Sequence, residues 1–276
     1  ARIDRHMESA VEAGIMVGGE GLIARGGHIV YHATWGDRDR EAGLPTTRDT
    51  LYRIYSMTKP ITAVAAMMLY EEGHFQLFDP VSKFIPAFKN TQVFVGGTAD
   101  NPKLAPMNRD ITIHDLFKHT ACMTYPFTKK PVDELYRRAH LFDGKRNSAK
   151  FVDAVAKLPL ACQPGSRHSY GVATDVLGRI VEVIAKEPLD VFMQRRIFEP
   201  LQMTDTGFFV PKAKHSRLIR MYQRGKSGTL KPVDKSLRDG FLSKPKMASG
   251  GGGLVSTIDD YLKFTQMLCL KLNVIT

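Results

Sequence analysis

Residues 51–73 read LYRIYSMTKPITAVAAMMLYEEG, and this stretch carries the clearest helical pattern of the 276-residue chain. Its apolar side chains recur at intervals of three and four residues, at Ile61, Val64, Ala65, Met68 and Leu69. Gly73 then ends the pattern in the manner of a C-terminal cap. Pro60 fits only in a first helical turn, because later turns need the backbone N–H that proline lacks. The stretch therefore predicts a helix that begins close to Ser56.

The start of this helix holds a serine and a lysine three residues apart. Residues at that spacing share a helical face, so the side chains of Ser56 and Lys59 can reach hydrogen-bonding distance. A serine hydroxyl becomes a nucleophile when a base takes its proton, and a lysine serves as base when its surroundings favour the neutral amine. Backbone N–H groups at the helix start can stabilise negative charge on an attacked carbonyl oxygen. We therefore predict Ser56 as nucleophile and Lys59 as its base.

A second copy of the Ser-x-x-Lys motif shows how little the motif says alone. It reads SKPK at residues 243–246 and lies in a basic, proline-containing loop without apolar periodicity. Nothing there would order the lysine or remove it from water. The motif by itself also fits a helix start with a solvated lysine, so the prediction for Ser56 depends on the helix that follows it.

The two ends of the chain predict a sheet with flanking helices. Residues 3–13 have helical spacing, and residues 21–25 and 28–32 are β-rich runs on either side of a Gly-Gly pair that suits a tight hairpin turn. Near the other end, Thr257 is placed to cap a helix over residues 258–270.

The middle of the chain alternates helical patterns with loops marked by proline and glycine. Helices are expected at residues 113–119, 148–158, 174–186 and 189–197, and short β-like runs follow at 207–210 and 221–223. We therefore expect an α/β region from residues 1–78 and 202–276 and a mainly helical region from residues 79–201.

Composition excludes several classes of function. The net charge is +11 and the pI about 9.6, but the basic residues form only scattered pairs and no nucleic-acid-binding signature accompanies them. We expect a basic solvated surface and no nucleic-acid partner. No run approaches the roughly 18 apolar residues of a membrane span, and the first residues lack the apolar run of a secretory signal. The chain as given is therefore expected to be soluble.

The cysteines predict neither a metal site nor a nucleophile. Cys122, Cys162 and Cys269 show no Cys-x-x-Cys or Cys/His spacing that would hold zinc, and three cannot all pair with one another. We expect reduced thiols and a cytoplasmic location. Cys122 lies in an apolar loop, which disfavours a reactive thiolate.

Five blocks follow one another along the chain, and they read LYRIYSMTKP (51–60), ITIHDL with HT (111–116, 119–120), YGVATDVLGR (170–179), IFEPL with MTDTGF (197–201, 203–208) and GLVST with DY (253–257, 260–261). Together they resemble the serine β-lactamase-like superfamily of class C β-lactamases, D-Ala-D-Ala peptidases and family VIII carboxylesterases, the last most closely. The resemblance implies an α/β (α+β) fold of the β-lactamase/transpeptidase type, in which an antiparallel sheet flanked by helices joins a helical region at Ser56.

The resemblance also assigns two tyrosines. Tyr170 matches the tyrosine of a Tyr-x-Asn pattern, which shares a proton with the lysine and passes it to the leaving group; a tyrosine merely packed at a helix start is the alternative. Val172 stands at the asparagine position, a departure that looks like the esterases, because losing an amide donor weakens binding of a polar substrate more than ester hydrolysis. Tyr125 matches a cleft-lining loop and is the predicted substrate-binding residue, with an ordinary surface aromatic as the alternative.

The third element of the family is a late strand that carries Lys-Thr-Gly, His-x-Gly or Trp-Gly-Gly and supplies an oxyanion donor. The glycines at 250–252 align by order with an earlier block, and the chain as given reaches Thr276 without such a strand. We therefore expect a fold that lacks its C-terminal strands. A fragment, a second chain that completes the fold, or an incomplete enzyme would each explain this.

The predicted reaction is hydrolysis of small to medium carboxylic esters through an acyl-enzyme on Ser56, without cofactor or metal. A β-lactamase, a D-Ala-D-Ala peptidase or an acyltransferase of the same fold stays open, and so does a non-catalytic scaffold or binding protein. His119 and His168 would suit a Ser-His arrangement, but no Gly-x-Ser-x-Gly elbow accompanies them, and His119 matches a structural position in the family. The oligomeric state stays open.

Overall fold

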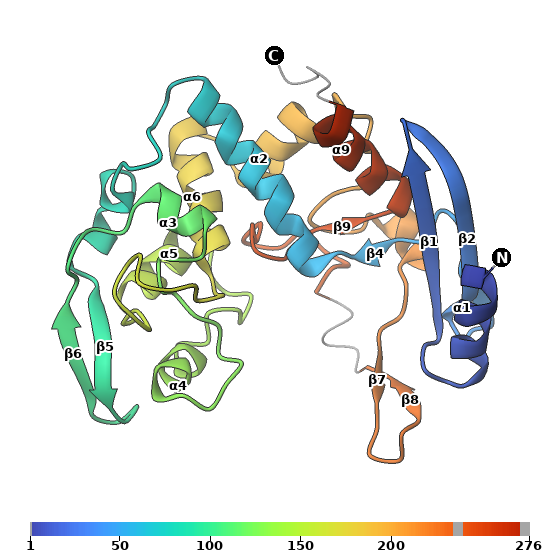
Figure 1. The fold of residues 1–276 in the computed structure, drawn as a ribbon, viewed down its shortest axis with the longest axis horizontal. Helices are drawn as coiled ribbons and strands as arrows, with labels where there is room; N and C mark the ends of the chain where they lie inside the picture. Colours follow the sequence, from blue (N-terminus) through green and yellow to red (C-terminus); the bar gives the residue numbers. More distant parts are fainter. Residues whose placement is uncertain (1, 234–239, 271–276) are drawn as a thin grey trace. The chain divides into compact units, whose positions relative to one another are not determined.

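The computed structural model describes residues 2–233 and 240–270, which form two compact units (Figure 1). The sheet unit comprises residues 1–54, 197–245 and 254–276, and the helical unit comprises residues 55–196 and 246–253. Residues 234–239 and 271–276, which the sequence assigned to the α/β region, lie outside the described residues.

The boundaries of the two units differ from the sequence expectation. Residues 55–78 were expected with the sheet, but they group with the helical region. The reason is that the helix after Ser56, α2 (Thr58–Glu71), packs against α6 (Ala173–Ala185). Residues 246–253 also join the helical unit, although they lie far along the chain from its other members.

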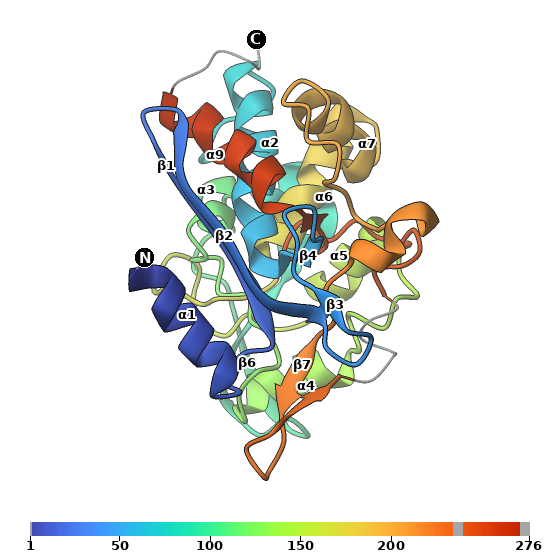
Figure 2. The ribbon, with the colours of Figure 1, turned by 90° about the vertical axis from the view of Figure 1, so that its right-hand side faces the viewer.

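The sheet unit begins as the sequence predicts. Helix α1 (Arg2–Glu12) precedes β1 (Gly18–Arg25) and β2 (His28–Asp39), which pair antiparallel from Arg25 opposite His28. Both turn glycines have positive φ, 58° and 83°, a conformation that glycine adopts at little steric cost. β3 (Leu44–Pro45) pairs with the far end of β2, and α1 contacts β2 (Figure 2).

Short strands from distant parts of the chain complete the sheet unit. β4 (Tyr52–Arg53) pairs antiparallel with β9 (Val255–Ser256), and β7 (Tyr222–Arg224) pairs with β8 (Leu230–Pro232). The predicted run at 207–210 contributes an isolated bridge from Gly207 to Val255. A small buried cluster lies beside β4 and β9 and comprises Leu51, Val210 and Val255, with Leu218 and Phe241 packed on it.

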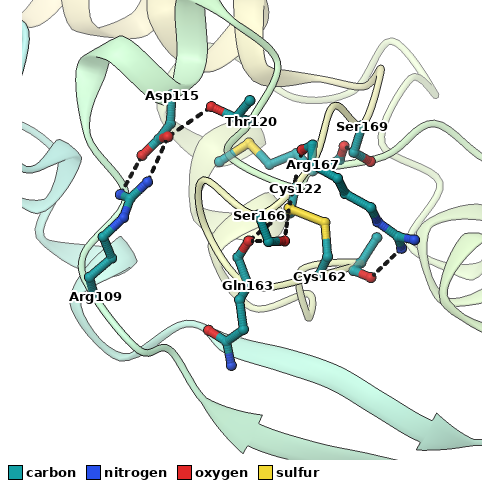
Figure 3. Close-up of a disulfide and its surroundings, with 11 residues drawn as sticks. Arg109, Asp115, Thr120, Cys122, Cys162, Gln163, Ser166, Arg167 and Ser169 are labelled. Carbon is teal, nitrogen blue, oxygen red and sulfur yellow. Dashed lines mark hydrogen bonds and ion pairs between the residues drawn. A yellow bond between two sulfur atoms is a disulfide. The ribbon is translucent and has the colours of Figure 1, made fainter.

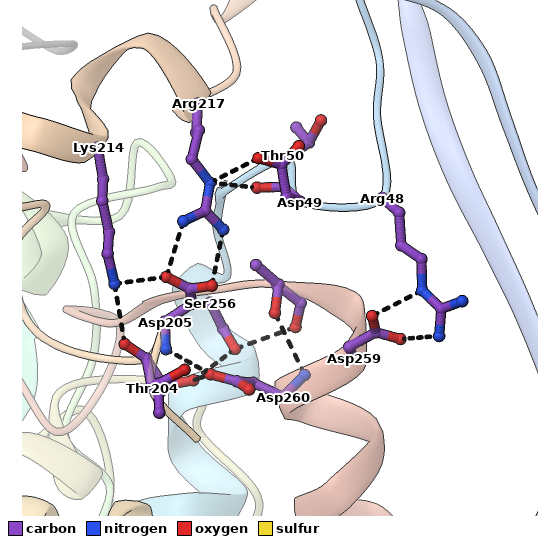
Figure 4. A network of polar contacts seen from close by, with 12 residues as sticks. Arg48, Asp49, Thr50, Thr204, Asp205, Lys214, Arg217, Ser256, Asp259 and Asp260 are labelled. Atoms are coloured by element: carbon purple, nitrogen blue, oxygen red, sulfur yellow. Dashed lines mark hydrogen bonds and ion pairs between the residues drawn. The ribbon is translucent and has the colours of Figure 1, made fainter. Parts of the chain in front are cut away.

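The last helix, α9 (Ile258–Leu270), begins in a polar network that explains its start. Thr257 Oγ1 accepts a hydrogen bond from Asp260 N at 3.2 Å, which confirms the predicted cap. The Asp260 carboxylate accepts from Asp205 N at 2.7 Å, and Asp205 in turn forms a bidentate ion pair with Arg217 at 3.0 and 2.7 Å (Figure 4). These hydrogen bonds and the ion pair link the start of α9 to the loop that contains Asp205.

The helical unit has its core between α2 and α6. Four side chains of this core are fully buried, Ile61 and Ala65 on α2 and Val176 and Ile180 on α6. Burying each large aliphatic side chain contributes about 1.5–3 kcal/mol to the stability of the fold. The other helices of the unit are α3 (Ile113–Phe117), α4 (Pro131–Arg138), α5 (Ser148–Ala156) and α7 (Leu189–Met193), with 3-10 turns at Tyr55–Met57, Val81–Lys83 and Pro86–Asn90.

Two features of the helical unit were missed by the sequence analysis. β5 (Gln92–Gly97) and β6 (Pro102–Pro106) form an antiparallel hairpin in a region that was expected to be mainly helical. The two prolines of β6 hide its strand character, since proline cannot donate to a β-ladder and is typical of edge positions. Helix α4 was also not predicted, because its short amphipathic pattern lies between loops.

Candidate active site

The backbone bends sharply just before Ser56. Tyr55 has φ of 41°, a left-handed conformation that is uncommon for a residue other than glycine and costs of order 1–3 kcal/mol. Ser56 follows inside the 3-10 turn Tyr55–Met57, and α2 starts at Thr58. The predicted helix start is therefore confirmed to within two residues. The bend leaves Ser56 exposed at the beginning of α2.

Three of the predicted site residues meet at this point. Ser56 Oγ lies 2.6 Å from the hydroxyl of Tyr170 and 3.2 Å from Lys59 Nζ. These two groups are the partners of the Ser56 hydroxyl within the described part of the chain. The Lys59 ammonium also lies 4.8 Å from the centre of the Tyr170 ring. The arrangement gives a serine hydroxyl two neighbours that can exchange a proton with it.

Tyr170 is held by the loop before α6. Ser169 N donates to His119 O at 2.8 Å, and Ser169 Oγ donates to Met123 O at 3.0 Å. Gly171 passes so close to the neighbouring loop that an added Cβ would lie 2.4 Å from Met123 O, so this position requires glycine. The loop segments that contain His119 and Met123 thus hold the backbone on both sides of Tyr170 and set the direction of its ring.

The environment of Tyr170 shifts its acidity. Burial raises the pKa of the phenol, but hydrogen bonds with Lys59 and Ser56 and the Lys59 charge outweigh burial and lower the pKa below its usual value of 10. Val172, at the place of the expected asparagine, is fully buried and presents no amide to the site.

Lys59 has a third contact, which the sequence analysis did not predict. Its Nζ donates to the carbonyl oxygen of Gly251 at 2.6 Å. Gly251 belongs to the run Ser249–Gly253, called the glycine loop below, and its N–H donates to the carboxylate of Asp175 on α6. A glycine run and an aspartate inside a helix carry no local signal of this role, because the contacts join segments 76 and 192 residues apart.

Tyr125 lies beside the same group of residues. Its ring centre is 5.5 Å from that of Tyr170 and 5.6 Å from Lys59 Nζ. Two further rings extend from it, with Phe127 stacked at 4.9 Å and Phe142 at 6.1 Å. Phe127 is 75% exposed and Phe142 51% exposed, so these rings form an aromatic wall that is open to solvent.

The histidines are arranged differently from a Ser-His pair. His119 packs with its ring centre 5.0 Å from that of Tyr170 and 5.7 Å from that of His168. Burial, together with the charges of Lys59 and His168, lowers the pKa of His119 to about 4, so its ring is neutral at pH 7. His119 therefore supports Tyr170 as a packed neutral ring.

The expectation of three reduced cysteines is wrong for two of them. Cys122 and Cys162 form a disulfide, with Cα atoms 5.3 Å apart (Figure 3), whereas Cys269 is free and exposed. No local pattern signals this pair, because the two loops meet only in the folded chain, where Ala161 N donates a hydrogen bond to Cys122 O at 2.7 Å. Disulfides persist mainly in oxidising compartments, so the thiol argument for a cytoplasmic location no longer holds.

The described residues also bear on the other sequence predictions. The second Ser-x-x-Lys copy, at residues 243–246, lies in bends and irregular structure without a helix. Residues 2–233 and 240–270 contain no cluster of three metal-binding side chains, and no helix among them is long and apolar enough to cross a membrane.

Comparison with known proteins gives a consistent family. A family model described as Beta-lactamase matches residues 3–274. Protein Rv1367c of Mycobacterium tuberculosis (strain ATCC 25618 / H37Rv) is 36% identical over 258 residues, which cover 93% of this chain and 63% of the relative. Esterase EstB of Burkholderia gladioli is 31% identical over 282 residues, which cover 95% of this chain and 68% of EstB.

Solved structures agree with the sequence matches. The structure of EstCE1, a hydrolase with promiscuous acyltransferase activity, superposes with a TM-score of 0.82 at 28% identity and covers 97% of this chain and 71% of EstCE1. The similarity thus supports the predicted β-lactamase-like fold along nearly the whole chain. The chain spans 63% of the length of the mycobacterial relative.

Proposed function

The chain belongs to the beta-lactamase family, and on this basis we propose that it is a serine hydrolase that cleaves carboxylic esters of small to medium acyl chains through an acyl-enzyme on Ser56. The observation that carries the proposal is the contact of Ser56 Oγ with both Tyr170 OH at 2.6 Å and Lys59 Nζ at 3.2 Å. If Lys59 were only solvated and Tyr170 only packed, we would not expect the polar groups of both side chains to contact the same hydroxyl.

The first half of the reaction forms the acyl-enzyme. Ser56 Oγ attacks the ester carbonyl carbon while its proton passes to the pair of Tyr170 and Lys59. Negative charge develops on the carbonyl oxygen, near the N–H groups at the start of α2. The tetrahedral intermediate collapses when the alkoxy group leaves with a proton from Tyr170, and the acyl group stays bonded to Ser56.

The second half repeats these steps with water. A water molecule attacks the acyl carbon and gives its proton to the same pair, the bond to Ser56 Oγ breaks, and Ser56 recovers its proton as the acid departs. One ester and one water thus yield one acid and one alcohol.

The ester preference has two supports. Val172 removes the amide that would hold a polar amide substituent, which favours esters over β-lactams. The aromatic wall next to Tyr170 offers apolar surface for an acyl chain, with Tyr125 as its inner part. EstB and EstCE1 are named as an esterase and a hydrolase, in agreement with this choice.

A fluorophosphonate probe tests the nucleophile directly. On protein expressed from the whole natural gene, we expect covalent labelling that is lost in Ser56→Ala and retained in Ser243→Ala, the serine of the second motif copy. Absence of label on the natural protein, or equal label on Ser56→Ala, would contradict the proposal and favour a non-catalytic binding protein.

Substrate turnover separates the enzyme classes. We expect p-nitrophenyl butyrate to be hydrolysed with higher kcat/KM than nitrocefin, and a large preference for nitrocefin would instead indicate a β-lactamase. An acyltransferase is the second candidate, because EstCE1 is described as having promiscuous acyltransferase activity. Added alcohol would then convert the p-nitrophenyl ester to a new ester faster than to the free acid.

A further inference from the structure

Asp175 is a buried carboxylate with few partners. It lies on α6 and is 5% exposed. Its Oδ1 accepts from Ser249 Oγ at 2.6 Å and from Gly251 N at 3.1 Å, both in the glycine loop. Its Oδ2 has no hydrogen-bond partner among the described residues. An aspartate in this setting destabilises the fold, because the free energy needed to remove a carboxylate from water exceeds the stabilisation from two hydrogen bonds.

The partners of Asp175 lead directly to Lys59. Gly251 bonds to the Asp175 carboxylate through its N–H and to Lys59 Nζ through its C=O, at 3.1 and 2.6 Å. The preceding carbonyl, that of Gly250, accepts from Thr62 Oγ1 on α2 at 2.8 Å. One residue of the glycine loop thus stands between a carboxylate of α6 and the amine that touches Ser56.

The absence of a side chain at Gly251 is part of this arrangement. An added Cβ would lie 2.4 Å from Asp175 Oδ2 and 3.0 Å from the hydroxyl of Tyr125. Any other residue would therefore push the loop away from α6 and move its carbonyl away from Lys59. Gly251 does not have a positive φ, so backbone conformation does not require glycine at this position. The close packing against Asp175 does.

We propose that Asp175 is a positioning residue: through Ser249 and Gly251 it fixes the backbone carbonyl that directs the Lys59 amino group toward Ser56. The inference rests on the proposed function, since it concerns the geometry of that reaction. Lysine has a flexible stem and three equivalent donors, so a fixed acceptor at 2.6 Å selects one orientation of the amine. Reaction rates are sensitive to such placement, and a 1 Å displacement can cost about 100-fold.

Three substitutions separate positioning from charge. Asp175→Asn keeps an oxygen that accepts from Ser249 and Gly251 but removes the negative charge, whereas Asp175→Ala removes the acceptor as well. We expect Asp175→Ala to lower kcat for p-nitrophenyl butyrate about 10–100-fold with KM within threefold, and Asp175→Asn to retain kcat within about threefold. Ser249→Ala, which removes one of the two bonds, should lower kcat about 3–10-fold.

A matched control is the buried Asp115, 2% exposed in the same unit, whose carboxylate binds Arg109 and threonines rather than the glycine loop. Asp115→Ala should lower the thermal midpoint while leaving kcat of the folded protein within about threefold. If Asp175→Ala does not fold, the Ser249→Ala result decides, because loss of one hydroxyl leaves the core packing intact.

Several outcomes would overturn the inference. Unchanged kcat in folded Asp175→Ala, unchanged kcat in Ser249→Ala, an effect confined to KM, or equal losses in Asp175→Ala and Asp175→Asn would each do so. The rate of fluorophosphonate labelling distinguishes this failure from that of the proposed function. An unlabelled natural protein would refute the function, whereas a labelled natural protein with an equal labelling rate in Asp175→Ala would refute the positioning role alone.

Discussion

Replacing Tyr170 with phenylalanine removes one oxygen atom and leaves the surrounding contacts in place. The lost hydroxyl lies 2.6 Å from Ser56 Oγ. The ring keeps its packing with His119 at 5.0 Å and with Tyr125 at 5.5 Å, and Lys59 Nζ stays 4.8 Å from its centre. Tyr170 is 40% exposed, so the change opens no buried cavity. The variant therefore isolates the proton-transfer role of the hydroxyl.

The expected loss follows from that role. A positioned general acid or base contributes about 10²–10⁴-fold to a rate, so we expect kcat to fall by about 10³-fold, which corresponds to about 4 kcal/mol. KM should change by less than about threefold, because the ring surface that meets the substrate is retained. If Tyr170 were only a packed aromatic at a helix start, kcat would stay within about threefold.

The assay follows p-nitrophenyl butyrate hydrolysis under steady-state and single-turnover conditions, together with the rate of fluorophosphonate labelling. Both rates should fall in Tyr170→Phe, since both require the activated Ser56. Tyr136→Phe is the control, because Tyr136 is a buried tyrosine of α4, 1% exposed, and makes no contact with Ser56 among the interactions of the described residues. A loss of less than tenfold in Tyr170→Phe, or a similar loss in Tyr136→Phe, would refute the proton-transfer role.

Three other predictions concern stability and selectivity. Cys162→Ser removes a disulfide that joins residues 40 positions apart, and the chain-entropy model gives a decrease of up to about 4 kcal/mol in the free energy of unfolding. Urea denaturation should show this decrease, with Cys269→Ser unchanged, and equal stability of the two variants would contradict it. For Asp115, burial raises the pKa, but the bond with its arginine partner and three further hydrogen bonds outweigh burial and lower the pKa from 3.8 to about 2. The carboxylate therefore stabilises the fold above pH 3.8, and about 2 kcal/mol is lost as the pH falls to about 2. Asp115→Asn should flatten the free energy of unfolding in that window, and an unaltered acid dependence would count against the assignment. Phe127→Ala should lower kcat/KM for p-nitrophenyl octanoate about 5–10-fold more than for the acetate, because the longer chain loses apolar contact. Phe78→Ala, at the same 75% exposure, should leave that ratio unchanged, and a shift in both variants would argue against an acyl-binding wall.

Local pattern was sufficient for the elements that surround Ser56. The apolar spacing after Pro60 and the cap at Thr257 depend on neighbouring residues alone. Helix α2 begins within two residues of Ser56, and α9 begins directly after Thr257 as predicted. The hairpin at residues 18–39 was predictable for the same reason, since its Gly-Gly turn is a short-range signal. The roles of Ser56, Lys59, Tyr170 and Tyr125 stay predictions, although the structure brings the four side chains together.

Contacts between distant segments account for what the sequence analysis missed. The Cys122–Cys162 disulfide was not foreseen, because an odd cysteine count favoured free thiols and only the fold brings the Cα atoms of the two cysteines to 5.3 Å from each other. Asp175 lies among the apolar residues of α6, where an aspartate carries no sign of its partners. Its contacts with the glycine loop can be recognised only in the fold, where residues 249–251 lie against α2 and α6.

The candidate site is assembled from three segments, and each has its own tie within the helical unit. Ser56 and Lys59 share one helix start, so their spacing is set by the backbone of α2. The disulfide closes the loops that lead to Tyr125 and Tyr170. The glycine loop is held by Asp175. Because every tie and every proposed catalytic side chain belongs to the same compact unit, the distances of 2.6 and 3.2 Å around Ser56 are properties of that unit alone. Productive geometry requires catalytic side chains to be placed within about 0.5 Å, and a single hydrogen bond between loops would not maintain this. Stability alone would not favour a buried carboxylate. The need for precise placement therefore gives a physical reason for Asp175.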